Sequence, residues 1–165
     1  MRTEVRAPLR VVAYAPWATW MTAHRQPIII LGLERMRKVV IAGGSGFIGK
    51  ALVKEFGANG YEVVVLSRTG NPVEGARAVQ WDGKTIGTWQ EELSGAEVVV
   101  NLCGESVMQR WTPASLQRIR DSRVKTTELI GEAISRCAIP PKTWLNASAI
   151  GWYGDTGARE VSEAS

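Results

Sequence analysis

Histidine is almost absent from this sequence, in which His24 is the only one among 165 residues. A Ser-His-Asp triad or a histidine-based metal site needs imidazole beside the other reacting or ligating groups, so both are excluded downstream of residue 24. Cysteine is scarce as well: Cys103 and Cys137 lack the C-x-x-C spacing of zinc or redox sites. We expect two reduced, buried thiols of the kind found in cytosolic proteins.

Long apolar runs are also missing. The longest, Ile28 to Leu33, is about a third of the ~18–20 residues that span a bilayer, so no membrane helix is expected. The net charge of +4 is concentrated at the start: residues 1–36 hold five arginines against two glutamates, whereas residues 37–165 hold 15 basic and 14 acidic side chains. This nearly neutral remainder has no basic stripe with interleaved aromatics, which argues against nucleic-acid binding.

The first 35 residues form a leader that does not resemble the rest, because prolines and tryptophans interrupt it and no period is sustained. It is an Arg-rich organelle transit segment, a small helix packed on the domain, or disordered, non-native sequence upstream of a true start at Met36. We favour the last, since a strand pattern begins abruptly after Met36. The expected location is cytoplasmic, or an organellar stroma or matrix if the leader is a transit segment.

From residue 37 onward, β-branched runs alternate with helical periodicity. The patterns predict strands over 38–42, 61–66, 76–81, 97–102 and 142–149, with helices from Phe47 to the Asn59-Gly60 turn and from Pro113 to about Cys137. Thr112 is the expected N-cap of the second helix, and Pro140-Pro141 stops it. Such alternation predicts an α/β fold with a doubly wound parallel sheet of about five strands.

A glycine-rich loop joins the first strand to the first helix. In the spacing Gly43-x-x-Gly46-x-x-Gly49, the first glycine permits the tight turn out of the strand. The second lets backbone approach a pyrophosphate, and the third lets helix and strand pack closely. The helix N-terminus offers free N–H groups to phosphates. The remaining loop positions expected to contact the dinucleotide are Ser45, Phe47 and Ile48.

This loop resembles the short-chain dehydrogenase/reductase superfamily in its extended, epimerase-like branch, over residues 36 to about 165. Four further segments are similar to its "epimerase family protein" subgroup: Asn101–Ser106, Arg110–Thr112, Ser122–Thr127 and Ala147–Gly154. The resemblance implies a Rossmann fold, a bound NAD(P) and a substrate-binding region in the C-terminal half of the family. We therefore expect residues 36–165 to be a C-terminally truncated dinucleotide-binding domain.

The end of the second strand bears on the choice of dinucleotide. NAD sites place an acid there for the ribose 2′-hydroxyl, and NADP sites place an arginine for the 2′-phosphate. Here the strand ends in Ser67, Arg68 and Thr69, and no acid lies between Glu62 and Glu74. Arg68 either pairs with the phosphate or is simply solvated. We expect NADP(H), with NAD(H) as the other possibility.

The resemblance also implies contacts to adenosine. Asp82 matches an acid that contacts the adenine in the superfamily, or is a turn residue before Gly83. The segment Leu102-Cys103-Gly104 resembles the family's segment beside the adenine ribose. Glu105 follows at the carboxyl end of the sheet, where open α/β folds bind ligands. Arg110 either reaches a substrate phosphate or carboxylate or caps a loop.

The proton-transfer pair of the superfamily, Tyr-x-x-x-Lys, does not occur: Tyr14, Tyr61 and Tyr153 all lack a lysine four residues later. Ser148 resembles the substrate-orienting serine of the family, and Tyr153 lies in its Tyr-Gly signature near the nicotinamide or is a packing aromatic. We expect a dinucleotide-binding part of an epimerase/reductase-like protein for a small polar substrate, inactive as it stands. The alternative is a non-catalytic module that senses the dinucleotide or binds another protein.

Overall fold

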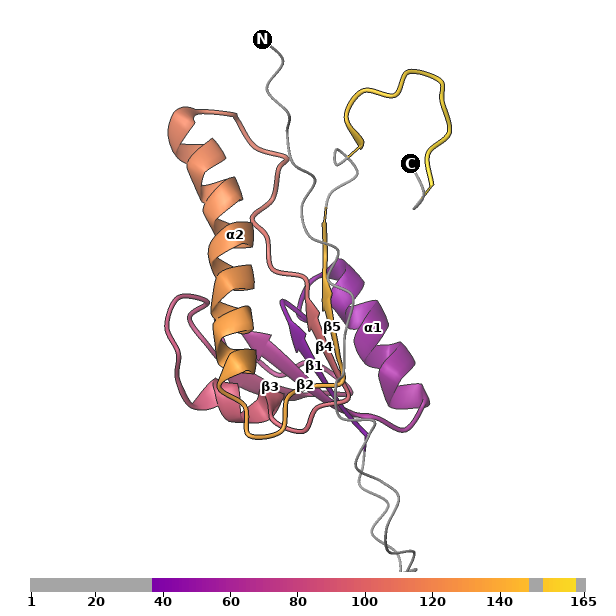
Figure 1. Ribbon diagram of the computed structural model, residues 1–165, viewed down its shortest axis with the longest axis vertical. Coiled ribbons are helices and arrows are strands. Elements are labelled where there is room, and N and C mark those ends of the chain that lie inside the picture. The colour runs from indigo at the N-terminus through magenta and orange to yellow at the C-terminus, as the bar shows by residue number, and fades with distance from the viewer. Residues whose placement is uncertain (1–36, 149–152, 163–165) are drawn as a thin grey trace, which may run out of the picture. The chain divides into compact units, whose positions relative to one another are not determined.

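The structure is a computed structural model that describes residues 37–148 and 153–162. Apart from the 3-10 helix η1, which was not predicted, its strands and helices follow one another in the predicted order (Figure 1). In chain order they are β1 (Lys38–Ala42), α1 (Phe47–Ala58), β2 (Glu62–Ser67), β3 (Arg77–Gln80), the 3-10 helix η1 (Thr88–Leu93), β4 (Val98–Asn101), α2 (Pro113–Ser135) and β5 (Thr143–Asn146). The expectation for residues 1–35 lies outside the described residues.

All the strands pair in parallel, in the order β3-β2-β1-β4-β5. The order reverses between β1 and β4, since β2 and β3 lie on one side of β1 and β4 and β5 on the other. Loops that follow β1 and β4 therefore leave the sheet in opposite directions and open a crevice at its carboxyl edge, where such folds bind ligands. This arrangement confirms the predicted doubly wound, Rossmann-type sheet.

Helices cover both faces of the sheet, with α1 on one face and α2 with η1 on the other (Figure 1). Side chains of a strand alternate between the two faces. Val39 and Ile41 of β1 accordingly pack with Val53 of α1, whereas Val40 and Ala42 belong to the cluster that contains Leu129 of α2. Burial on both faces explains why the central strands β1, β2 and β4 read as continuous apolar runs.

The start of α2 follows the predicted capping. Thr112 is the N-cap and Pro113 occupies the first turn, as expected. Ser115 completes a reciprocal box that the sequence analysis did not anticipate: its N–H donates to Thr112 Oγ1 at 3.2 Å, and its Oγ accepts from the Thr112 N–H at 2.7 Å. The two bonds satisfy N–H groups that would otherwise be unpaired at the helix start.

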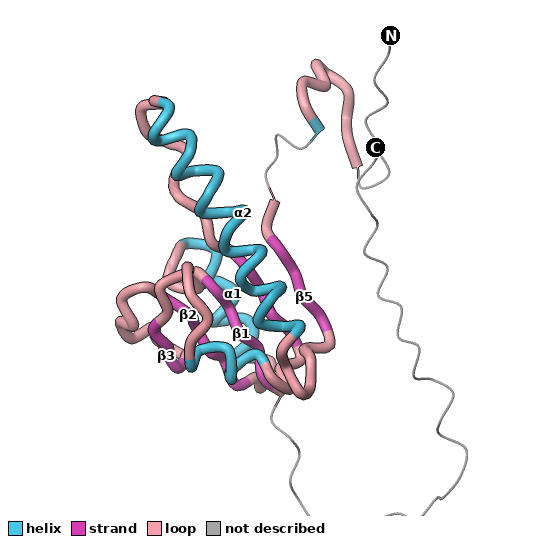
Figure 2. The backbone as a smooth tube through the Cα atoms, turned by 60° about the vertical axis from the view of Figure 1, so that its left-hand side comes forward, coloured by secondary structure: helices cyan, strands magenta, loops and turns pink. Residues whose placement is uncertain are grey.

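Two expectations about burial are wrong. In a doubly wound sheet the strand predicted over 142–149 would be buried on both faces, but β5 covers Thr143–Asn146 and is exposed along its length. It pairs with β4 on one side, and Trp144 and Leu145 remain 39% and 52% exposed although the Trp144 ring lies against Gly131 of α2. The helical spacing of Leu116 with Ile130 and Ala133 predicts that Leu116 lies on the packed side of α2. The N-terminal turns of α2 instead extend beyond the strands (Figure 2), which leaves this side chain exposed.

Other expectations concern thiols and membranes. Cys103 and Cys137 are free, as predicted, but partly rather than fully buried, since both lie where an element has just ended. Within the described ranges, no helix is long and apolar enough to cross a bilayer.

Candidate functional site

The glycine loop turns sharply out of β1. Gly43 has a φ of +78°, a conformation that residues with a Cβ rarely adopt. Its N–H donates to the Leu66 carbonyl at 3.0 Å, and a Cβ at this position would lie 3.2 Å from the Leu102 carbonyl carbon. The turn is therefore held between the end of β2 and the segment that follows β4. This confirms the predicted tight turn.

The part of the glycine loop around Gly44 packs against the start of α1. A Cβ on Gly49 would lie 2.4 Å from Gly44 Cα, so the predicted close approach is to the loop itself rather than to the strand. Gly44 is constrained in turn, because a Cβ there would lie 2.7 Å from Val65 Cγ2. The sequence analysis missed Gly44. The sequence shows a second glycine directly after Gly43, but the side chain that leaves no room for a Cβ at Gly44 is Val65 of β2, which the loop sequence does not reveal.

The space beside Gly46, where the glycine loop leads into α1, is unoccupied by the described residues. A Cβ on Gly46 would meet no atom closer than the Gly43 carbonyl oxygen at 3.5 Å, and Phe47 and Ile48 are 94% and 60% exposed. Gly46 caps α1 without a side-chain hydrogen bond, and the first turn contains no acidic residue. The N–H groups at the start of α1 are thus available to an anion, which the positive end of the helix dipole also favours.

An exposed cation follows β2. Within the described part of the chain, the Arg68 guanidinium makes no hydrogen bond or ion pair, although its charge is close enough to act on Cys103 and Glu105. Ser67 is buried and its Oγ accepts from the Gly70 N–H at 3.1 Å, while Thr69 Oγ1 accepts from a backbone N–H in the same turn. Both hydroxyls keep their own proton for another acceptor.

Asp82 forms a turn. Its carboxylate accepts from the Thr85 N–H at 2.9 Å, the Lys84 N–H at 2.8 Å and the Thr85 hydroxyl at 2.7 Å. These bonds, led by that from the Thr85 N–H, lower the pKa of Asp82 to about 2. The turn alternative from the sequence is therefore realised, and the contact with adenine stays a prediction.

An amide cluster lies at the carboxyl ends of β4 and β5. Buried Asn101 donates through Nδ2 to Asn146 Oδ1 at 2.7 Å and accepts from the Cys103 N–H at 3.1 Å. Thr127 of α2 also donates to Asn146 Oδ1, at 2.9 Å. The cluster ties two strands and α2 to the Leu102-Cys103 segment. Asn101 and Thr127 were predicted only as parts of motifs and Asn146 was not predicted at all; the strand register, which pairs Asn101 with Asn146, supplies their role.

The segment after Cys103 is fastened to α2. The Glu105 N–H donates to Ser122 Oγ at 2.8 Å, and Arg123 Nη1 donates to the Glu105 carbonyl at 3.2 Å. A Cβ on Gly104 would lie 3.0 Å from Arg123 Cζ, so the guanidinium occupies the space beside this glycine. These contacts give the Ser122–Thr127 motif a physical role, which is to hold the loop that follows β4.

Two of these predicted side chains have shifted titrations. Hydrogen bonds from Gln109 and Arg118 lower the pKa of Glu105, which therefore stays ionised. Burial raises the pKa of the Cys103 thiol to about 11, against a smaller opposing effect of Arg68. Cys103 is thus a thiol rather than a thiolate near neutral pH.

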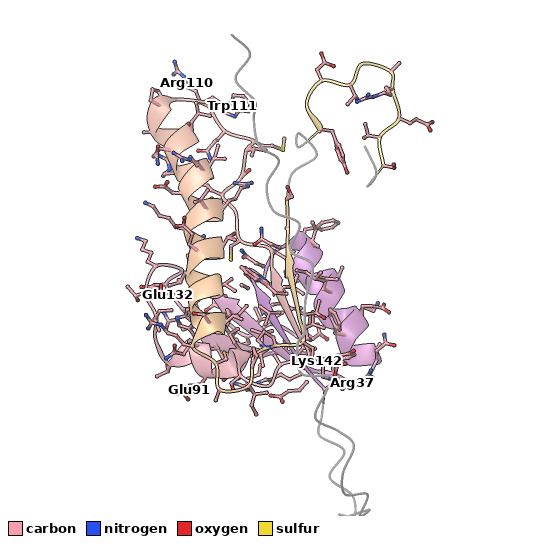
Figure 3. The ribbon with its side chains drawn as sticks, viewed as in Figure 1. Arg37, Glu91, Arg110, Trp111, Glu132 and Lys142 are labelled. Carbon is pink, nitrogen blue, oxygen red and sulfur yellow. The ribbon has the colours of Figure 1, made fainter. Side chains whose placement is uncertain are left out.

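The structure brings together the loops that follow β1, β2 and β4, and with them most of the predicted dinucleotide contacts. Arg110 lies apart, at the N-terminal end of α2 beyond the strands (Figure 3), with its carbonyl accepting from Ser115 Oγ. Ser148 is exposed just after β5, and Tyr153 is 39% exposed. The Ala149–Trp152 part of the motif between them lies outside the described residues. Among the described residues, no group of acidic, cysteine or histidine side chains could hold a metal ion.

Comparisons with known proteins extend this picture. The model of the NAD dependent epimerase/dehydratase family matches residues 39–165. An epimerase family protein of Mycobacterium leprae is 37% identical over 131 residues, which are 79% of this chain and 41% of that protein. The human epimerase family protein SDR39U1 is 31% identical over 131 residues, 78% of this chain and 42% of its own length.

Solved structures share the fold. The crystal structure of human SDR39U1 with NADPH is 32% identical, covers 70% of this chain and 38% of its own, and gives a TM-score of 0.57. A UDP-glucose 4-epimerase that is 20% identical gives a TM-score of 0.61 over 78% of this chain and 40% of its own. The chain spans about two fifths of the length of the curated relatives it matches. On this evidence, the chain belongs to the NAD dependent epimerase/dehydratase family.

Proposed function

We propose that this chain binds a nicotinamide dinucleotide along the carboxyl edge of its sheet and prefers NADP(H) to NAD(H). The observation that carries the preference is the exposed Arg68 guanidinium at the end of β2, which has no partner among the described residues. No acid stands at this position to accept a ribose hydroxyl. The NADPH in the crystal structure of human SDR39U1 supports the same choice.

The residues present fit such a ligand. The open space over Gly46 and the uncapped start of α1 suit a pyrophosphate, which a Cβ at Gly46 would crowd. Arg68 and the hydroxyls beside it suit a 2′-phosphate, since a guanidinium pairs strongly with phosphate oxygens. Leu102, Cys103 and Gly104 would line the adenosine side, and Asp82 would approach the adenine. The bound dinucleotide would supply hydride transfer.

Titration of the chain with NADPH and NADH, followed by ligand fluorescence or calorimetry, tests the preference. The Arg68→Ala variant should weaken NADPH by about 1.5–3 kcal/mol, the range for hydrogen bonds to charged groups, and leave NADH unchanged. Arg120→Ala, which removes an exposed arginine of α2, is the matched control and should change neither affinity. Equal wild-type affinities, or a preference for NADH, would overturn the assignment of Arg68.

For catalysis, we propose that Ser148 orients a small polar substrate and that Tyr153 lies beside the nicotinamide. These 165 residues hold no tyrosine with a lysine four positions later, and general acid–base catalysis needs a tuned group within reach of the proton. The chain by itself should therefore bind the dinucleotide without turnover. NADPH oxidation with aldehydes, ketones and quinones tests this. Turnover that Ser148→Ala and Tyr153→Phe both abolish would contradict it.

The same missing pair favours a second candidate, a non-catalytic module that senses the dinucleotide or binds another protein. Binding of NADPH without turnover of the tested carbonyl compounds is expected for both candidates, whereas turnover by this chain would rule this one out. We further propose that residues 36–165 fold as a domain without the leader. A chain that starts at Met36 should then melt at the same temperature as the full chain, and a drop of several degrees would show that residues 1–35 stabilise it.

A further inference from the structure

A groove of about 940 Å³ runs along α1, beside the glycine loop. One wall is α1, with Lys50, Val53 and Lys54, and the other is the segment that follows β2, from Thr69 to Gly75. Ser45 lies in the lining as well, so the groove begins at the phosphate-binding end of the loop. Thr69, which follows Arg68 in the chain, also belongs to the lining. The proposed dinucleotide site and this groove are therefore continuous.

Two lysines give the groove its charge. Lys50 and Lys54 stand one helical turn apart on the same side of α1, and neither makes a hydrogen bond or ion pair to any described residue. Glu74 is the one acidic side chain in the lining. Its neighbour Gly75 lies beside Val53, since a Cβ there would be 3.5 Å from Val53 Cγ1. Glu74 therefore lies beside the middle of α1, away from the end of the groove that Ser45 lines.

Resting on the NADP(H) binding proposed above, we propose that Lys50 is a second cation for the 2′-phosphate, which would lie at the mouth of the groove between Lys50 and Arg68. A phosphate monoester carries about −1.5 to −2 charge at pH 7, so a single guanidinium leaves it incompletely neutralised. The Ser45 and Thr69 hydroxyls lie at the same end and can donate to it. NAD(H) carries a neutral hydroxyl at this position, so Lys50 discriminates between the two dinucleotides.

Lys54 provides a matched control within the same groove. A helix rises about 1.5 Å per residue, which places the Lys54 backbone about 6 Å further than Lys50 from the start of α1. Both side chains are exposed, so replacing either removes a charge without opening the core. A role for general positive potential along the groove predicts equal effects of the two lysines, whereas a direct contact with the phosphate predicts an effect of Lys50 alone.

The test measures the dissociation constants of the full chain for NADPH, NADH, 2′,5′-ADP and 5′-AMP. Lys50→Met keeps the aliphatic stem and should weaken NADPH and 2′,5′-ADP by roughly tenfold, the lower end for a charged hydrogen bond at an exposed site. NADH and 5′-AMP should bind as before. Lys54→Met should change every constant less than about twofold, and Lys50→Arg should restore NADPH binding, because it restores the charge.

The outcomes separate this inference from the function on which it rests. If Arg68→Ala impairs NADPH selectively and Lys50→Met does not, the role of Lys50 is wrong and the proposed function stands. Equal losses for NADPH and NADH in Lys50→Met would place the lysine on the pyrophosphate and overturn the inference. Equal effects of Lys50→Met and Lys54→Met would do the same. A wild-type chain that binds neither dinucleotide would overturn both proposals.

Discussion

The Arg123 guanidinium fills the space in which a side chain on Gly104 would lie: a Cβ there would be 3.0 Å from Arg123 Cζ and 3.1 Å from Nη2. From this position Arg123 Nη1 donates to the Glu105 carbonyl at 3.2 Å and to the Ile119 carbonyl at 2.9 Å. The absence of a side chain at Gly104 thus allows α2 to hold the loop that follows β4. This contact therefore positions the Leu102–Gly104 segment of the proposed adenosine site.

Gly104→Ala should displace the Arg123 guanidinium and weaken its hydrogen bond to the loop. We expect a loss of about 1 kcal/mol in the free energy of unfolding, the usual value of one intramolecular hydrogen bond. Urea denaturation of Gly104→Ala, Arg123→Ala and the double variant forms a cycle. In the Arg123→Ala background, the alanine at 104 should cost almost nothing. The same cost in both backgrounds would show that the contact has no energetic effect.

Gly49→Ala should destabilise the chain far more, by about 3 kcal/mol or above, because its Cβ would lie 2.4 Å from the backbone of Gly44. Backbone cannot move aside as a flexible side chain can. Gly57→Ala is the matched control in the same helix, where a Cβ meets nothing within 4 Å. Gly57→Ala should raise the free energy of unfolding by about 0.5–1 kcal/mol, because alanine has the better helix propensity. Thermal melting of both variants tests this prediction. Equal changes in melting temperature for Gly49→Ala and Gly57→Ala would refute the close packing of Gly49 on Gly44.

The Asp82 turn should contribute a pH-dependent stability. The pKa of Asp82 is lowered from 3.8 to about 2, so the folded state favours the ionised carboxylate. Its stabilisation is fully present above the ordinary value of 3.8 and is lost as the pH falls through about 2. The difference in unfolding free energy between wild type and Asp82→Ala should therefore be constant above about pH 4 and shrink below it. If wild type and Asp82→Ala differed in unfolding free energy by the same amount at pH 2 and pH 6, the turn would not favour the ionised carboxylate.

Cys103 should react slowly with thiol reagents. Burial raises its pKa from 9.0 to about 11, so little reactive thiolate exists at pH 8. In a Cys137→Ser chain, in which Cys103 is the remaining cysteine, the alkylation rate should keep rising with pH until about 11. Arg68→Ala should slow the reaction further, because the positive charge of Arg68 in the wild type favours the thiolate and the variant lacks it. An alkylation midpoint near 9 would mean that the thiol is solvated.

Much of the fold was predictable from short segments of sequence. The limits of β1 were predicted to the residue, and Gly43, Thr112 and Pro113 have the local roles that the sequence indicated. These features depend on backbone dihedral angles and on hydrogen bonds between residues a few positions apart. Such preferences are properties of the residue types and are present before the chain packs. The alternation of strands and helices then restricted the sheet to a parallel one.

The tertiary structure alone decided the features that depend on residues far apart in the chain. Gly44 is required by Val65 of a neighbouring strand, Gly104 by Arg123 of α2, and Asn101 finds its partner only when β4 and β5 are in register. The exposure of β5 depends on what covers it, which no pattern within the strand records. The sequence by itself determined where the parallel strands and the two α-helices lie and that a glycine-rich loop joins the first strand to the first helix, because those choices are local. Which side chains meet at the sheet edge was decided by packing, because the free energy of a contact exists only once both partners are in place.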